Sequence, residues 1–224
     1  MSEPQKADAI IVAAGSGTRF GAPKQLAGLR GMPMYQHSLK VFAEHPLISR
    51  LVLVISADHF ARIEGELGNE FCGKNIEITL GGAVRQDSVF NGLQKLEESD
   101  HSDIVLVHDA ARPFITPEVI TNVIGAVEKF GAALAAIPIV DTLKQSEDGF
   151  TTATIPRKDL WRAQTPQGAK FDLLKRALLE AQTKNYTGSD EAELLEKIGV
   201  RSYLSLGDGK NRKITFEQDL QEYS

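Results

Sequence analysis

The sequence predicts an α/β fold built on one doubly wound, mostly parallel β-sheet. Short apolar runs alternate along the chain with amphipathic helical segments, and short loops join them. Several of the apolar runs are continuous, which is typical of strands that helices cover on both faces. We therefore expect a single domain over residues 1–224, with one β-rich arm at about residues 138–156.

Composition and charge exclude several classes of protein. Hydrophobic residues make up 42% of the chain and charged residues 25%, which is ordinary for a globular domain. The net charge of −5 argues against a nucleic-acid partner. Because no apolar run approaches the ~20 residues of a membrane span and the first residues are polar, we expect a cytoplasmic protein with no membrane partner. A single cysteine, Cys72, excludes an internal disulfide.

Strands and helices alternate through the first 130 residues. Thr116 and Pro117 are typical of a helix start, because Thr is a favoured N-cap and Pro is tolerated in the first turn. Gly131 is a typical helix end. We expect strands at residues 7–13, 51–55, 76–80 and 104–107, and helices at 33–43, 59–67, 84–96 and 117–130.

The pattern changes after a fifth expected strand at residues 132–137. Two β segments, at 141–145 and 150–155, flank a Ser-Glu-Asp-Gly turn and predict a hairpin that belongs to no strand–helix unit. We assign neither helix nor strand to residues 161–168. Helices at 172–182 and 189–197 and a short strand at 201–206 complete the chain.

The first expected strand ends in a glycine-rich turn, Gly15-Ser16-Gly17. Two cationic residues, Arg19 and Lys24, come after this turn. Such a turn exposes backbone N–H groups that can surround phosphate oxygens, and nearby cations neutralise the remaining charge. The stretch therefore predicts a nucleoside triphosphate site. The alternative is a tight strand–helix turn whose cations lie on the surface.

Two known phosphate-binding patterns do not match this turn. The dinucleotide pattern G-x-G-x-x-G requires glycine where this chain has Phe20, and it also requires an acidic residue about 20 positions further on. The P-loop requires Gly-Lys followed by Ser or Thr, whereas residues 21–24 are Gly-Ala-Pro-Lys. Both a nicotinamide-dependent oxidoreductase and a P-loop enzyme are therefore disfavoured.

Several polar loops follow expected strands. Ligands of open parallel sheets bind at the carboxyl ends of the strands. The loops in question are residues 15–24, 81–88, 108–112 and the stretch around 141–142. We expect them to share one edge of the sheet and to form a single site.

Asp109 and Arg112 have the residue types that a phosphate site needs. One carboxylate at the end of a buried strand suits a magnesium ion that keeps its waters and bridges phosphates. Arg112 offers a planar guanidinium to a phosphate. The alternative is an Asp109–Arg112 ion pair that orders the loop. For His108 we favour a structural role, because displacement between phosphates needs no imidazole.

The loop at residues 81–88 is consistent with recognition of a base, because Gly81 and Gly82 permit close backbone approach. It also fits a turn before a helix with Ser88 in its first turn, and the two interpretations are compatible. Asp190 and Glu191 have the chemistry of metal ligands, but acids in a first helical turn favour the helix dipole in any case. We favour that second role for them.

Seven segments, taken together, resemble the 2-C-methyl-D-erythritol 4-phosphate cytidylyltransferase family. They are AAGSGTRFGAPKQ, GGAVRQDSV, VHDAARPF, DT at residues 141–142, LWRAQTPQ, SDEA and NRKIT, and they occur in this order between residues 10 and 219. The resemblance implies a Rossmann-like nucleotidyltransferase of the non-mevalonate isoprenoid pathway. Its substrates are CTP and a sugar-alcohol phosphate, methylerythritol 4-phosphate, its cofactor is Mg²⁺, and its products are CDP-methylerythritol and pyrophosphate.

A ribitol 5-phosphate cytidylyltransferase shares much of this pattern and is the alternative. Ala110 and Ala111, within HDAARP, favour the methylerythritol enzyme. One position departs from some family members, which have an acidic residue where this chain has Ala83. A backbone contact with the base survives that change, whereas a side-chain contact does not.

The resemblance also implies roles for individual residues. Arg19, Lys24 and Lys213 would stabilise the charge that develops during the reaction. Thr142 and Arg157 would reach the partner's site in a homodimer formed through the arm. The nucleotide would be held by Ala13, Ala14, Gly15, Gly82, Ala83, Ser88 and Asp109, with Asp109 also near the metal, and the sugar phosphate by Arg112, Thr142, Arg157 and Thr165.

Overall fold

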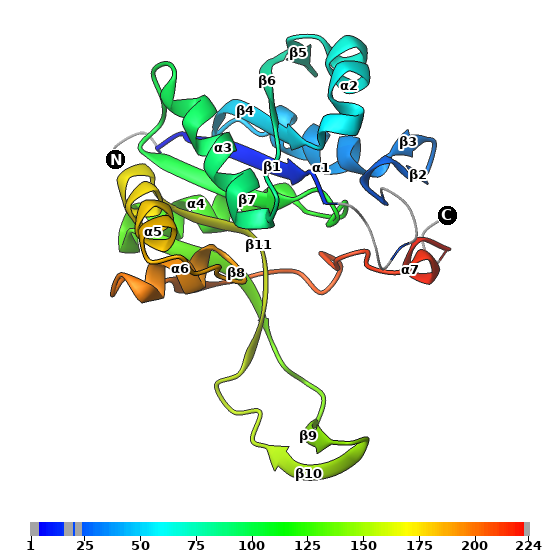
Figure 1. Ribbon diagram of the computed structural model, residues 1–224, viewed down its shortest axis with the longest axis vertical. Coiled ribbons are helices and arrows are strands. Elements are labelled where there is room, and N and C mark those ends of the chain that lie inside the picture. Colours follow the sequence, from blue (N-terminus) through cyan, green and yellow to red (C-terminus); the bar gives the residue numbers. More distant parts are fainter. Residues whose placement is uncertain (1–4, 16–19, 21–23, 222–224) are drawn as a thin grey trace.

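The computed structural model describes residues 5–15, 20 and 24–221. Within them, the central sheet has the strand order β12-β8-β11-β7-β1-β4-β6-β5 (Figure 1). β1, β4, β6 and β7 are mutually parallel, and β12 is parallel to β8. The strands are β1 (Ala7–Ala13), β4 (Ile48–Ile55), β5 (Glu70–Phe71), β6 (Lys74–Leu80), β7 (Ile104–Asp109), β8 (Ala132–Pro138), β11 (Trp161–Lys170) and β12 (Tyr203–Leu206).

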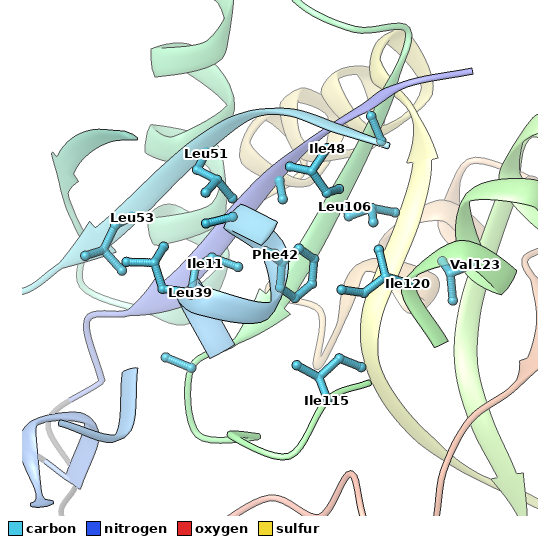
Figure 2. Packing of buried hydrophobic residues seen from close by; sticks show 14 of the residues in the cluster. Ile11, Leu39, Phe42, Ile48, Leu51, Leu53, Leu106, Ile115, Ile120 and Val123 are labelled. Atoms are coloured by element: carbon cyan, nitrogen blue, oxygen red, sulfur yellow. The ribbon is translucent and has the colours of Figure 1, made fainter. Parts of the chain in front are cut away.

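Helices cover both faces of this sheet, because successive side chains of each buried strand point to opposite sides. In β1, Ile11 belongs to a core with Phe42 and Ile120, whereas Ile10 belongs to a second core on the other face. Figure 2 shows the first of these cores. The predicted doubly wound α/β fold is confirmed. The helices are α1 (Met34–Glu44), α2 (Phe60–Leu67), α3 (Arg85–Glu97), α4 (Pro117–Phe130), α5 (Phe171–Thr183), α6 (Glu191–Lys197) and α7 (Glu217–Gln221).

The elements predicted before residue 138 lie where they were expected. β1 has the predicted bounds, and most of the others differ by one to three residues at either end. α4 begins at Pro117, and Gly131 ends it with a φ of 84°, a left-handed conformation that favours glycine. Thr116 has the extended backbone of an N-cap, but its side chain makes no capping hydrogen bond. Among the described residues, no helix is long and apolar enough to cross a lipid bilayer.

Residues 161–168, to which we assigned no structure, belong to β11, the antiparallel strand between β7 and β8. The sequence does not reveal this strand, because Pro is disfavoured in a central strand and buried strands are usually apolar. β11 contains Pro166 and the polar residues Gln164, Thr165 and Gln167. The register against β8 shifts between Ala163 and Gln167. This irregularity lies where β11 contacts the loops described below.

The predicted hairpin is also present. It consists of β9 (Leu143–Glu147) and β10 (Phe150–Ile155), so its first strand starts two residues later than expected. Figure 1 shows the hairpin well apart from the central sheet, at the end of two extended segments that continue β8 and β11. Phe150 is 77% exposed and Val140 is 68% exposed. The arm thus leaves apolar side chains in contact with solvent.

Replacing Gly92 in α3 tests how closely this helix packs on the sheet. A Cβ at this position would lie 2.6 Å from Cγ2 of Ile10 and 3.1 Å from Cγ2 of Val54. We expect Gly92→Ala to lower the free energy of unfolding by about 1–3 kcal/mol, because the core cannot move aside without strain. Gly125→Ala in α4 is the control, since nothing lies within 4 Å of the position that its Cβ would take. Urea unfolding of both variants checks this, and equal stability of the two would contradict it.

Candidate active site

The ends of β1, β6 and β7 and the start of α3 meet at one edge of the sheet. A Cβ at Gly81 would lie 2.3 Å from Cβ of Ala14 and 2.9 Å from Oγ of Ser88, so only glycine fits there. The backbone N–H of Ala110 donates to the carbonyl of Val12, at 3.0 Å. The loops after β1, β6 and β7 are therefore neighbours, as their common position in a parallel sheet predicts.

Ser88 orders the loop before α3. Its buried hydroxyl accepts from the N–H of Gly82 at 3.1 Å and donates to the carbonyl of Val84 at 3.2 Å. A Cβ at Gly82 would lie 2.2 Å from Cβ of Asp87, so this glycine permits a close approach within the loop itself. Gly82 and Ala83 are exposed. Their backbone is thus available to a base, and their predicted contact with cytosine stays a prediction.

Asp109 is a buried carboxylate that lies between two cations. Its Oδ1 accepts from Nε of Arg85 at 2.8 Å, and its Oδ2 accepts from Nζ of Lys213 at 2.6 Å. Burial opposes ionisation, but the charges of Arg85 and Lys213 hold the pKa of Asp109 far below its usual range. The carboxylate is therefore ionised. The ion pair with Arg112 that we considered is wrong, because Arg85 and Lys213 take that place.

Arg85 joins Asp109 to a second carboxylate. Its Nη1 and Nη2 donate to the two oxygens of Glu191, at 2.6 and 3.0 Å. Glu191 is only 3% exposed. Sequence reasoning missed this pairing, because the two residues lie far apart in the chain and both stand in the first turns of ordinary helical patterns.

Thr165 and His108 form a buried hydrogen-bonded chain behind Asp109. The hydroxyl of Thr165 accepts from the N–H of Asp109 and donates to Nδ1 of His108, both at 3.1 Å. Nε2 of His108 then donates to the carbonyl of Arg112, at 3.2 Å. The structural role favoured for His108 agrees with these contacts. Thr165, which we expected at the sugar phosphate, uses its hydroxyl to support Asp109.

The loop that carries Lys213 is fixed by Arg112 and Asn211. Nη1 of Arg112 donates to the carbonyl of Asn211 at 2.9 Å, and the fully buried amide of Asn211 donates to the carbonyl of Thr165 at 2.8 Å. The N–H of Ile214 donates to the carbonyl of Ala111 at 2.8 Å. Lys213, which looks like a surface lysine in its local sequence, is therefore held at Asp109 by a well-anchored loop.

The glycine-rich turn is described only in part. Arg19 lies outside the described residues, as do residues 16–18 and 21–23. Lys24 begins a short 3-10 helix, η1 (Lys24–Leu26). The buried side chain of Gln25 donates to the carbonyl of Gly15 at 2.8 Å, so this helix is held against the end of β1. No sequence signal marked Gln25 as an anchor.

The two arm residues do not join this cluster within the same chain. Thr142 and Arg157 are exposed and flank the β9–β10 hairpin, which Figure 1 shows apart from the central sheet. Arg157 donates to the backbone carbonyl of Val140 within the arm. Our expectation that the stretch at 141–142 shares the site edge with the other loops is therefore wrong for a single chain, since the arm carries it away.

One carboxylate is available to a metal ion at the site. Within the described ranges, no group of three or more His, Cys, Asp or Glu side chains is placed to hold a metal ion. A carboxylate has about four lone-pair positions, and Arg85 and Lys213 occupy two of those of Asp109. About two lone-pair positions of Asp109 thus stay open, which fits a Mg²⁺ ion that takes its other ligands from phosphates and water.

Comparison with known proteins identifies the family. The model of the family described as IspD, 2-C-methyl-D-erythritol 4-phosphate cytidylyltransferase, matches residues 7–223. The chain belongs to this cytidylyltransferase family. The relative of that name from Acidobacterium capsulatum is 42% identical over 223 residues, covering 95% of this chain and 93% of its own.

Solved structures with family names agree with this assignment. The crystal structure named 2-C-methyl-D-erythritol 4-phosphate cytidylyltransferase from Thermus thermophilus has a TM-score of 0.80 and 30% identity, over 98% of this chain and 97% of that one. A structure titled 4-diphosphocytidyl-2C-methyl-D-erythritol synthase has a TM-score of 0.82 and 34% identity, over 97% and 96%. The cytidylyltransferase fold thus extends over nearly the whole chain.

His108 makes the stability of this fold depend on pH. Burial lowers the pKa of His108 from 6.5 to about 4, so the folded state stays neutral where the unfolded chain takes up a proton. The free energy of unfolding should therefore fall by roughly 2 kcal/mol between pH 7 and pH 5 on account of His108. Burial also lowers the pKa of His45, which adds to the fall.

Urea unfolding at a series of pH values measures this dependence. The free energy of unfolding of His108→Gln should depend less steeply on pH than that of the wild type, whatever the absolute stability of the variant. His101→Gln, at an exposed position, is the control for the replacement of an imidazole by an amide. A His108→Gln profile as steep as that of the wild type would refute the assignment.

Proposed function

We propose that this chain transfers the cytidylyl group of CTP to 2-C-methyl-D-erythritol 4-phosphate and releases pyrophosphate. The observation that carries the proposal is the family match over residues 7–223, which includes every loop of the Asp109 cluster. The relatives and structures reported above carry the name of this activity, and none of them is named for ribitol phosphate.

The reaction is a displacement at phosphorus. An oxygen of the sugar-alcohol phosphate attacks the α-phosphorus of CTP, and the bond from that phosphorus to the oxygen bridging the β-phosphate breaks. The electron pair leaves with pyrophosphate. Because no covalent enzyme intermediate is required, catalysis consists of positioning and charge stabilisation.

The described residues are suited to both tasks. The ammonium of Lys213 is partly exposed, so it can donate to a phosphate oxygen as charge develops there. Arg112 brings a second cation to the same edge, and the backbone of Gly82 and Ala83 is open to the base. Ala13 ends β1, and Ala14 and Gly15 follow it, at the place where the nucleotide is proposed to bind. Arg19 and Lys24 keep the roles that the resemblance implies for them.

Mg²⁺ is proposed as the cofactor, with Asp109 as its single protein ligand. When bound, the ion would neutralise part of the triphosphate charge and polarise the α-phosphate. The chain's own contribution is to keep Asp109 ionised at the end of β7 and to fix its direction through Arg85 and Lys213. We also propose a cytoplasmic location, because both substrates are charged phosphates.

A pyrophosphate-release assay tests the proposed function. With CTP and Mg²⁺, we expect turnover with methylerythritol 4-phosphate and much slower turnover with ribitol 5-phosphate. Absence of CTP-dependent pyrophosphate release with either acceptor would refute the proposal. Faster turnover with ribitol 5-phosphate would instead favour the alternative enzyme.

We further propose that the active form is a homodimer in which the arm of one chain completes the site of the other. The arm exposes Val140 and Phe150, which a partner surface would cover. Thr142 and Arg157 flank the hairpin, apart from the Asp109 cluster of their own chain. A second copy of this chain supplies the site with arm residues that it otherwise lacks.

Mixing two inactive variants tests this arrangement. Lys213→Ala removes a cation of the site itself, and Arg157→Ala removes the arm residue; each variant alone should lose most of its turnover. After subunit exchange, about a quarter of all sites should combine an intact Lys213 with the partner's intact Arg157, by random pairing in a twofold dimer. Activity should therefore return to about a quarter of the wild-type value.

Lys210→Ala, three residues before Lys213 on the same loop, is the control and should keep normal turnover, since Lys210 is exposed. A mixture that stays as inactive as its components would show that the arm does not act in trans. A monomeric mass by light scattering would contradict the homodimer directly.

A further inference from the structure

Glu191 is a buried charge for which the proposed reaction gives no use. It is the first residue of α6 and is 3% exposed. Removing a carboxylate from water is costly, so a chain retains one in this position only when a strong partner compensates for the lost hydration. Arg85 is that partner, because two of its nitrogens donate to the two oxygens of Glu191.

The anchoring of α6 does not require Glu191. Asp190 caps the helix by accepting from the N–H of Glu193 at 2.9 Å. Gln167 of β11 donates to Asp190 at 3.0 Å and accepts from the N–H of Ala192 at 2.9 Å. Leu194 and Leu195 are buried in the core. Since these contacts already fix α6 on the sheet, the Glu191 carboxylate has another effect.

That effect is on Arg85. A guanidinium prefers to bind one carboxylate with two parallel N–H groups. Here the two terminal nitrogens of Arg85 bind Glu191 end-on, and Nε, at 2.8 Å, is the Arg85 atom that donates to Asp109. Asp109 therefore gives only one oxygen to Arg85, and its other oxygen stays with Lys213. The cluster of two carboxylates and two cations is also electrically balanced.

We propose that Glu191 is a positioning residue for the transfer reaction, a role that rests on the proposed function. By binding the two terminal nitrogens end-on, it fixes the orientation of the Arg85 guanidinium and keeps Arg85 from binding both oxygens of Asp109. Asp109 then keeps one oxygen for Lys213 and holds its ammonium at the site. Without Glu191, Arg85 turns toward Asp109 and displaces Lys213.

The kinetic test compares Glu191→Gln with Glu193→Gln. Glutamine keeps the shape of the side chain but loses the charge and one acceptor. We expect kcat to fall about 10- to 100-fold, the usual loss when a reacting group is displaced by about 1 Å, while the KM for CTP changes little. Glu193, on the same helix, is only partly buried and binds Ser189 away from Arg85, so its replacement should leave kcat near the wild-type value.

A crystal structure of the Glu191→Gln variant tests the geometry without reference to activity. We expect two hydrogen bonds from Arg85 to Asp109 and loss of the contact between Lys213 and Asp109. An unchanged Lys213–Asp109 contact, or an unchanged kcat in the folded variant, would overturn the proposal. If the wild-type chain has no turnover, the proposed function fails, and the crystal structure still decides whether Glu191 sets the position of Lys213.

Glu191→Asp provides a second variant should the glutamine variant fold poorly. It keeps the charge but shortens the side chain by one methylene, so Arg85 cannot reach both carboxylates in the same geometry. We expect a smaller loss of kcat in the same direction. Normal kcat in this variant, together with an intact Lys213–Asp109 contact in its crystal structure, would also overturn the proposal.

Discussion

The sharing of one buried carboxylate between two cations is the interaction on which the rest of the site depends. Asp109 is 7% exposed, and a charge in such a position must be paired. Its partners come from distant parts of the chain, Arg85 from α3 and Lys213 from the loop after β12. The three side chains meet only when the parallel strands are in register. The site is therefore a consequence of the whole sheet and not of any single motif.

Polar groups behind the Asp109 carboxylate hold it rigidly in place. Thr165, His108 and Asn211 are almost fully buried, and their hydrogen bonds join β7, β11 and the Lys213 loop. Hydrogen bonds that join separate segments in this way favour one arrangement of those segments. This explains why β11, at the centre of the sheet, has polar residues where neighbouring strands are apolar. The amino-terminal half of β11 therefore contributes less hydrophobic packing, and its polar side chains instead fix the positions of Asp109 and Lys213.

The sequence predicted the strands and helices that follow a clear period, including β1, α4 and the hairpin of the arm. It failed at β11, because Pro166 and buried glutamines give no strand pattern. Of the site, the strand-end loops and Asp109 could be inferred from the residues, since parallel strands place their ends at one edge. Lys213 entered only through the family resemblance. Arg85 was not seen as a partner of Asp109, because nothing in one sequence reveals a contact across 24 residues.

The direction of β8 connects this site to the arm. β11 is antiparallel to both β7 and β8, so β8 runs parallel to β7 and ends at the same edge of the sheet as Asp109. The arm therefore leaves the body beside the active site and takes Thr142 and Arg157 with it. In the proposed homodimer, twofold symmetry makes this exchange reciprocal, because each chain that gives arm residues also receives them. In that arrangement both sites would be complete together, and catalysis would require association of the chains.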